Sequence, residues 1–236
     1  MVKSGMKRIV AVIQARMWSS RLPGKMMLSL HGHPIIEWVV RRVTAARTLD
    51  NVVVAIPDTR NDDILAQFIT ENLKAKVYRG SEQDVLNRFL GAAKFAQASH
   101  VVRVCADNPL VSGEVIDELI DFYTDNPCDY AYNQGDGGRT NAYPDGLGAE
   151  IVPFTLLEWM DQHATDPRHR EHCLTYIVDN TDQFTIKTFD PPDQRIACPW
   201  LKLDMDNLED YCRLALKRFS ITSTPCDIVQ AFSEEQ

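Results

Sequence analysis

The sequence predicts an α/β fold with a mostly parallel sheet and helices on both faces. Apolar runs of strand length occur at 8–14, 51–57, 75–80 and 100–106, and a helical pattern follows each of them. Four strand–helix units in succession require crossover connections, which favour a parallel sheet. We interpret the whole chain, 1–236, as one domain.

Each of the four helical segments carries its own signal. Residues 34–47 place their aliphatic side chains on one face at helical spacing. Segment 61–73 has acidic residues in its first turn, and segment 81–97 opens with a Ser-x-x-Asp capping pattern. The fourth helix, 112–125, begins at the capping residue Ser112.

The pattern is less regular after residue 128. We predict, in order, a loop or lid at 133–148, helices at 154–162 and 170–180, strands at 183–189 and 200–206, and a closing helix at 208–219. The strand at 200–206 rests on the alternation of apolar and polar residues in WLKLDMD. The opening residues MVKSG are interpreted as an extension outside the fold.

Composition excludes several kinds of partner. The net charge of -8 argues against a nucleic-acid duplex, because proteins that bind one usually present a basic face. The apolar runs are far shorter than the roughly 20 residues that a membrane span needs. The cysteines form no C-x-x-C pair and are interpreted as free thiols of a reducing cytosol. We expect a cytoplasmic protein that binds neither nucleic acid nor a membrane.

The loop QARMWSSRLPGK, 14–25, is a candidate anion site. It carries Arg16, Arg21, Lys25 and a Pro-Gly turn directly after the first predicted strand. Ligands of open parallel sheets bind at the carboxyl ends of the strands, and turn amides beside cations can hold phosphate. The loop lacks the glycine pattern of a Walker A motif. The same composition also suits a solvated surface loop, so residue types leave both interpretations open.

Three carboxylates are candidate metal ligands. Asp107 follows the fourth strand in CADNP, and Asp204 and Asp206 share one face of the predicted strand 200–206. Mg²⁺ typically binds one or two protein carboxylates together with phosphate oxygens. Each residue also has a structural interpretation: a turn at Asp107, a solvent-facing strand edge at Asp204 and a helix cap at Asp206.

Taken together, these motifs resemble the cytidylyltransferase family of CMP-Kdo and CMP-sialic acid synthetases. The loop IQARMWSSRLPGK matches the approximate pattern A-R-x-x-S-x-R-L-P-G-K. The segments RGSEQDVLNRF, ADNPL, YPDGLGAEI, REHCLTYI and KLDMDNLEDY are similar to the spore-coat polysaccharide biosynthesis protein F type. The resemblance covers about 8–219, nearly the whole chain.

The resemblance implies a Rossmann-like nucleotidyltransferase fold and an activity. The expected reaction is Mg²⁺-dependent transfer of CMP from CTP to an acidic sugar or related acidic acceptor. It releases pyrophosphate and belongs to activated-sugar or surface-polysaccharide biosynthesis. Many members are homodimers through the irregular middle region, so 130–200 is the expected lid, dimerisation and acceptor subdomain. Its candidate interface anchors, which could also fill the subdomain's own core, are Tyr130, Tyr132, Phe154, Trp159 and Tyr176.

The resemblance also implies the site residues. The catalytic set is Arg16, Lys25, Asp107 and Asp206. The nucleotide-binding set is Gln14, Ala15, Arg16, Arg21, Gly24, Lys25, Arg79, Gln83 and Asp84. The acceptor-binding set is Arg139, Asp145 and Glu150, and the metal ligands are Asp107, Asp204 and Asp206.

Two other functions are compatible with the sequence. A nucleotide-sugar-dependent glycosyltransferase would use the Asp-x-Asp of Asp204 and Asp206 as its metal site, and it would release a nucleotide instead of pyrophosphate. A non-catalytic nucleotide-binding protein would bind the nucleotide without turnover.

Overall fold

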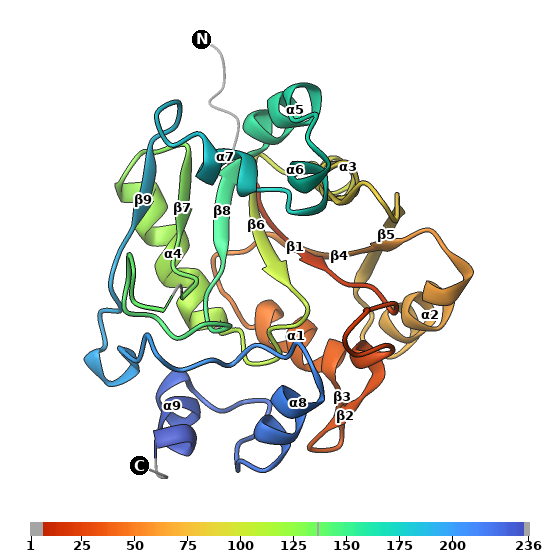
Figure 1. Cartoon of the computed structure of the whole chain (residues 1–236), viewed down its shortest axis with the longest axis vertical. Coiled ribbons are helices and arrows are strands. Elements are labelled where there is room, and N and C mark those ends of the chain that lie inside the picture. The colour runs from red at the N-terminus through yellow and green to blue at the C-terminus, as the bar shows by residue number, and fades with distance from the viewer. Residues whose placement is uncertain (1–6, 136, 234–236) are drawn as a thin grey trace.

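The computed structural model describes residues 7–135 and 137–233, and the opening segment MVKSG lies outside this range (Figure 1). Seven strands of the described residues form the central sheet, in the order β5-β4-β1-β6-β8-β7-β9. They are β1 (Ile9–Gln14), β4 (Asn51–Pro57), β5 (Lys76–Gly80), β6 (His100–Cys105), β7 (Tyr130–Tyr132), β8 (Glu150–Pro153) and β9 (Ile186–Thr188). Only β8 runs antiparallel to its neighbours in this sheet, so the prediction of a mostly parallel sheet is confirmed.

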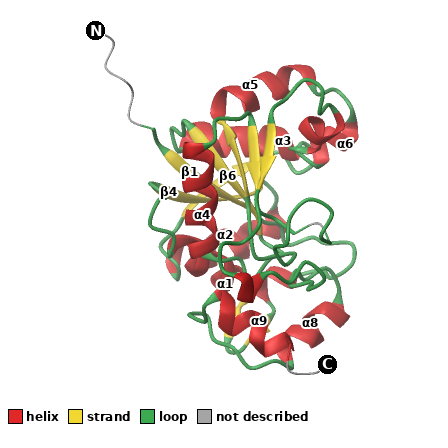
Figure 2. Ribbon diagram, turned by 90° about the vertical axis from the view of Figure 1, so that its left-hand side faces the viewer, coloured by secondary structure: helices red, strands yellow, loops and turns green. Residues whose placement is uncertain are grey.

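Helices cover both faces of the sheet (Figure 2). They are α1 (Ile35–Thr44), α2 (Asp63–Glu71), α3 (Val85–Phe95), α4 (Gly113–Asp125), α5 (Phe154–His163), α6 (Pro167–Glu171), α7 (Thr175–Asp179), α8 (Leu208–Ala215) and α9 (Pro225–Ser233). Short 3₁₀ turns occur at Lys25–Met27, Arg60–Asp62 and Gln194–Ile196, and a small hairpin joins β2 (Ser29–Leu30) to β3 (His33–Pro34).

Alternate residues of β1 enter two separate cores. Val10 and Val12 pack with α3, α5 and the buried residues around α7. Ala11 and Ile13 pack on the opposite face with α1, α2, α4 and α9. Because side chains alternate along a strand, an apolar run such as β1 can be buried on both faces, and this explains the two helical layers.

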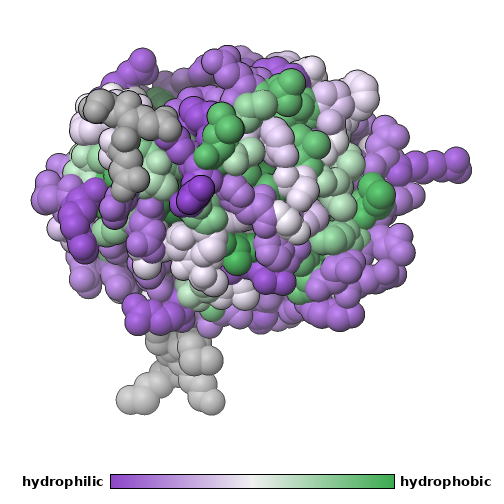
Figure 3. Space-filling model, turned by 90° about the horizontal axis from the view of Figure 1, so that it is seen from below, coloured by the Kyte–Doolittle hydropathy of each residue, from purple (hydrophilic) through white to green (hydrophobic). Residues whose placement is uncertain are grey.

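The surface is hydrophilic over much of the face seen from below, with smaller hydrophobic areas between the polar side chains (Figure 3). Within the described part of the chain, no helix is both long and apolar enough to cross a membrane.

The predicted strand at 200–206 is wrong. In this segment only Lys202 forms a bridge, to Asp145 of the preceding loop. Its alternation still has a physical cause, because Leu203 and Met205 are fully buried in the core, while Asp204 and Asp206 form ion pairs with Lys202 and Arg21. An extended segment that packs one face on a core shows strand periodicity even without a ladder of hydrogen bonds.

Other boundaries also differ from the predictions. The helix predicted at 170–180 is divided into α6 and α7, because His172 leaves the helical region at φ -108° and ψ 76°. Asn207, not Asp206, caps α8, with Asp210 completing a capping box. Ser112 stands at the N-cap of α4, but its side chain makes no capping hydrogen bond. The sequence pattern did not reveal α9, β7 or β8.

The middle region adds β7, β8 and β9 to the central sheet. Of the predicted interface anchors, Tyr130 is buried and stacks on Tyr132 within the chain. Trp159 and Tyr176 meet edge to face. These contacts agree with the core-filling interpretation of the aromatic residues, and the homodimer stays a prediction.

Candidate functional site

The loop after β1 is held by backbone contacts. The Gly24 amide donates to the Met17 carbonyl at 2.8 Å, and Gly24 has a φ of 74°, which glycine adopts without strain. The buried Asp62 carboxylate accepts from the Met17 amide at 2.8 Å and from the Thr59 hydroxyl at 2.6 Å. Asp62 therefore anchors the loop, a role that its position before the second helix did not indicate.

A cavity of about 250 Å³ lies at the carboxyl ends of β1 and β6, and we call it the cation-rich cavity. Its lining includes the arginine and lysine residues Arg16, Arg21, Lys25, Arg88 and Arg103, against the carboxylates Asp107 and Glu171. Gln14 and Ala15 also line it. Its walls therefore carry surplus positive charge in a chain whose net charge is -8. Such a cavity favours a polyanionic ligand.

Cations and carboxylates meet at one end of this cavity. The Lys25 ammonium is nearly buried and donates to the Met205 carbonyl at 2.9 Å. It lies 3.6 Å from Asp107 and 4.0 Å from Asp206. Arg21 binds both carboxylate oxygens of Asp206, at 2.6 and 2.7 Å. The structure thus brings together four predicted residues from three distant segments.

Asp204 and Asp145 lie beside this cluster. Gly146 has a φ of 86°, and a Cβ there would stand 2.7 Å from the Asp204 amide, so glycine allows the loop to approach this closely. One carboxylate oxygen of Asp204 is buried without a hydrogen-bond partner. Burial, followed by the charge of Asp204, raises the pKa of Asp145 to about 6. Burial likewise raises the pKa of Asp204.

The donor set fits a hard divalent cation in part. The unpartnered oxygen of Asp204 and the carboxylates of Asp107 and Asp206 are oxygen donors of the kind that Mg²⁺ prefers. However, no group of three or more such side chains in the described residues is arranged as a metal site. Lys25 and Arg21 stand against these carboxylates instead. Phosphate oxygens would therefore have to complete the coordination.

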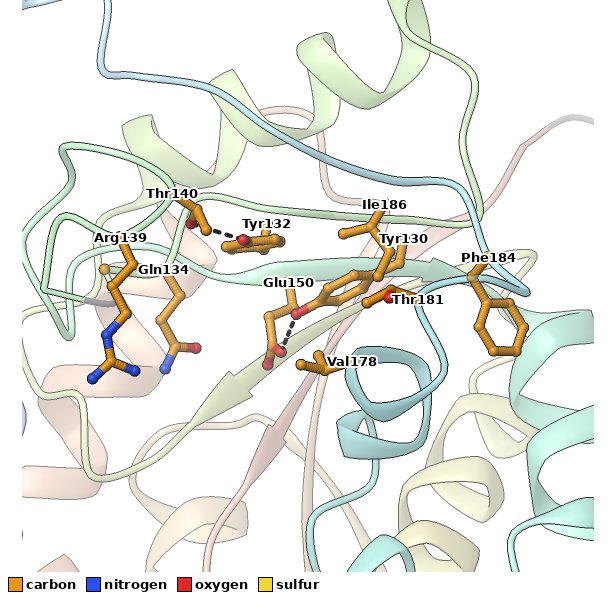
Figure 4. A pocket seen from close by; sticks show the side chains of 11 residues that line it. Tyr130, Tyr132, Gln134, Arg139, Thr140, Glu150, Val178, Thr181, Phe184 and Ile186 are labelled. Carbon is orange, nitrogen blue, oxygen red and sulfur yellow. Dashed lines mark hydrogen bonds between the residues drawn. The ribbon is translucent and has the colours of Figure 1, made fainter.

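A second cavity, of about 650 Å³, lies beside the cation-rich cavity, and we call it the aromatic cavity (Figure 4). Tyr130 and Tyr132 stack in its wall with centroids 5.3 Å apart. The Tyr130 hydroxyl donates to Glu150 at 2.6 Å, while Arg139 and Gln134 lie at the other end. Two of the predicted acceptor residues, Arg139 and Glu150, thus line this cavity. The third, Asp145, lies near Asp204 instead.

A chain of polar contacts joins the two cavities. The Gln14 side chain donates to the Cys173 sulfur at 2.9 Å and accepts from Arg103 at 2.9 Å. Arg103, in the wall of the cation-rich cavity, forms an ion pair with Glu150 in the wall of the aromatic cavity. Arg103 and Glu150 therefore connect the walls of the two cavities.

The predicted cluster at 79–84 lies outside both cavities. Arg79 is bound by Asp58 at 3.1 Å and by Asp63 at 2.7 Å. Asp84 caps α3, so the helix begins later than the Ser-x-x-Asp pattern indicated, and it also binds Arg170. Gln83 is exposed. None of the three lines either cavity.

Sequence reasoning missed two arginines of the cation-rich cavity. Arg88 follows Val85 by three positions, on the buried face of α3. Arg103 interrupts the apolar strand β6. In each case a charged residue on an otherwise apolar face was the available signal, because a buried charge requires a partner or a ligand.

Residues 10–189 match the family model described as cytidylyltransferase. The spore coat polysaccharide biosynthesis protein SpsF of Bacillus subtilis is 34% identical over 212 residues, 87% of this chain and 84% of that protein. A 3-deoxy-manno-octulosonate cytidylyltransferase of Bdellovibrio bacteriovorus is 34% identical over 120 residues, 51% of this chain and 47% of that protein.

A solved structure extends the match to almost the whole chain. The structure of a cytidylyltransferase from Leptospira borgpetersenii is similar with a TM-score of 0.85 and 30% identity, over 97% of this chain and 95% of that one. This confirms the expected Rossmann-like nucleotidyltransferase fold. The chain is therefore a member of the cytidylyltransferase family of nucleotidyltransferases.

Proposed function

We propose that this protein transfers CMP from CTP to an acidic sugar or a related acidic acceptor, with Mg²⁺, and releases pyrophosphate. The observation that carries the proposal is the cation-rich cavity, which lies at the carboxyl ends of parallel strands beside the carboxylates of Asp107 and Asp206. The relatives named as a sugar-acid cytidylyltransferase and as a polysaccharide biosynthesis protein support the class of acceptor.

The charge that develops during CMP transfer suits the cationic walls of the cation-rich cavity. Attack of an acceptor hydroxyl on the α-phosphorus of CTP forms a new P–O bond and breaks the bond to the β-phosphate, so negative charge develops on the leaving pyrophosphate. Such transfers depend on positioning and on neutralisation of charge. Arg16, Arg21 and Lys25 are the cations that would receive the triphosphate.

The triphosphate would also change the ion pairs of the site. Arg21 and Lys25 now neutralise Asp206 and Asp107, and phosphate oxygens would compete for both cations. The released carboxylates, together with Asp204, would hold Mg²⁺. When bound, Mg²⁺ supplies positive charge to the phosphate oxygens.

The aromatic cavity is the proposed acceptor site. Its volume of about 650 Å³ is large enough for a sugar acid, and Arg139 offers a cation for a carboxylate. The Arg103–Glu150 ion pair places it next to the proposed nucleotide site. The stacked Tyr130 and Tyr132 offer an apolar surface to a sugar ring.

The test is release of pyrophosphate from CTP in the presence of Mg²⁺ and a panel of acidic sugars. We expect release with one of these acceptors, and none with CTP alone or without Mg²⁺. Release of a nucleotide from a nucleotide-sugar, with no pyrophosphate, would replace the proposal by the glycosyltransferase. Binding of CTP without turnover of any acceptor would favour the non-catalytic protein.

A further inference from the structure

Arg88 is a buried cation with few partners. Its side chain comes from the second turn of α3 and is only 3% exposed, yet it forms part of the wall of the cation-rich cavity. One terminal nitrogen donates to the carbonyls of Ser81 and Glu82. Its Nε is buried and has no hydrogen-bond partner. Within the described residues, no ion pair includes Arg88.

A second buried arginine shows what a structural guanidinium looks like in this fold. Arg42 is 6% exposed and likewise forms no ion pair with the described residues. All three of its nitrogens nevertheless donate to main-chain carbonyls, namely those of Leu110, Val111, Ile221 and Ser223. Arg42 is satisfied by the protein alone, whereas Arg88 is not.

The unmet hydrogen bonds of Arg88 require an explanation. A buried charge without a counter-ion destabilises a fold, and here burial lowers the pKa of the guanidinium. An unpartnered buried donor adds to that destabilisation. Both are relieved when a ligand with hydrogen-bond acceptors fills the cavity against Arg88.

The position of Arg88 in the cavity indicates which part of a bound nucleotide it would contact. The cavity crosses the edge of the sheet, from Met26, which belongs to the core on one face, to Val85, which belongs to the core on the other. Lys25 lies at the Met26 end with the carboxylates, where the phosphates are proposed. Arg88 lies at the Val85 end, which is left for the base.

We propose that Arg88 donates hydrogen bonds to the base of the bound nucleotide and selects cytosine over uracil. Cytosine presents O2 and N3 as adjacent acceptors, which match the forked donors of a guanidinium, whereas N3 of uracil carries a hydrogen. A site built from such donors rejects an analogue that leaves one of them unpaired. This inference rests on the proposed use of CTP.

The test compares Arg88→Met with the matched variant Arg42→Met. Binding of CTP, UTP, CMP and cytidine is measured by calorimetry, and the Tm of each ligand-free protein is recorded. For Arg88→Met we expect CTP, CMP and cytidine to bind about 10- to 100-fold more weakly by a common factor, with loss of the preference for CTP over UTP. The ligand-free Tm should fall less than that of Arg42→Met, because Arg88 donates to main-chain carbonyls through one nitrogen and Arg42 through three.

The control variant Arg42→Met should lose stability and keep its affinity for CTP. Arg42→Met leaves main-chain carbonyls without donors, so its Tm should fall while its affinity for CTP is retained. Arg88→Lys covers the case in which the methionine variant does not fold. It keeps the charge but loses the fork, and it should also lose the preference for CTP.

Each of the remaining outcomes would contradict either the proposed function or the proposed role of Arg88. If the wild type binds no nucleoside triphosphate, the proposed function fails and Arg88 loses its ligand. If the wild type prefers CTP and Arg88→Met or Arg88→Lys retains that preference, Arg88 does not read the base. A loss of affinity that grows with the number of phosphates places Arg88 at the phosphates. A lower Tm with unchanged binding makes Arg88 structural.

Discussion

The two cavities are joined by the ion pair between Arg103 of β6 and Glu150 of β8, but they are built from different parts of the sheet. Arginine and lysine residues surround the cation-rich cavity, which is formed by loops at the ends of the parallel strands. The aromatic cavity is lined by β7, β8 and β9, where strand direction changes, and stacked tyrosines form part of its wall. Under the proposed function, separate regions would therefore supply charge for the phosphates and apolar surface for the acceptor.

An ion pair joins the walls of the two cavities. Arg103 belongs to the wall of one cavity and Glu150 to the wall of the other. Their coupling can be measured because changes in one cavity should affect one substrate, whereas changes in the ion pair should affect both.

Asp107→Asn should give the largest effect, because it removes a proposed metal ligand from the phosphate end. We expect Mg²⁺-dependent turnover to fall about 10³-fold or more, with circular dichroism and Tm close to those of the wild type. Steady-state rates over a Mg²⁺ titration check this. Full activity with an unchanged Mg²⁺ dependence would remove Asp107 from the metal site.

Lys25→Ala should give the next largest effect, and this effect should be confined to nucleotide binding. Loss of its charge should weaken CTP binding about 10- to 100-fold and CMP binding much less. Calorimetry with both nucleotides checks this, while the KM of the acceptor should stay nearly constant. Equal weakening of CTP and CMP would place Lys25 away from the β- and γ-phosphates.

Glu150→Gln should affect both cavities, because it leaves Arg103 buried without its carboxylate. We expect about tenfold higher KM values for CTP and for the acceptor, and a free energy of unfolding lower by about 3 kcal/mol. Tyr130→Phe is the control, since it removes only the hydroxyl that donates to Glu150. A change in the KM of the acceptor alone would show that the ion pair does not couple the sites.

Asp145→Asn should have the smallest effect and one that depends on pH. Because the folded-state pKa of Asp145 is raised to about 6 from 3.8, its ionised form destabilises the fold fully above pH 6, and the penalty disappears as the pH falls below 3.8. Without Mg²⁺, the variant should be more stable than the wild type by about 1–2 kcal/mol at pH 7.5, after allowance for partial exposure.

The difference should vanish near pH 3, below the unfolded-state pKa of 3.8, where Asp145 is protonated in both states. Denaturant unfolding at the two pH values checks this, with the exposed Asp182→Asn as control. A gain of stability that is the same at both pH values would contradict the assignment to ionisation of Asp145.

The parallel strands and the cationic loop after β1 were predictable because their signals are local. Apolar runs such as β1 must be buried, and the cations of 14–25 follow one of them directly. The segment 200–206 shows the limit of such signals. Its alternation correctly separated the buried Leu203 from Asp204, but alternation cannot reveal whether a neighbouring strand supplies hydrogen bonds.

What the sequence determined by itself is therefore the order of the first four strand–helix units and the charged character of the loop after β1. Periodicity and turn residues depend only on near neighbours. Only the tertiary structure decided that Arg79 forms ion pairs with Asp58 and Asp63, whereas Arg88 lines the cation-rich cavity and forms no ion pair with the described residues. Which carboxylate pairs with an arginine depends on the tertiary structure. The candidate carboxylates lie on separate elements that come together only in the folded protein.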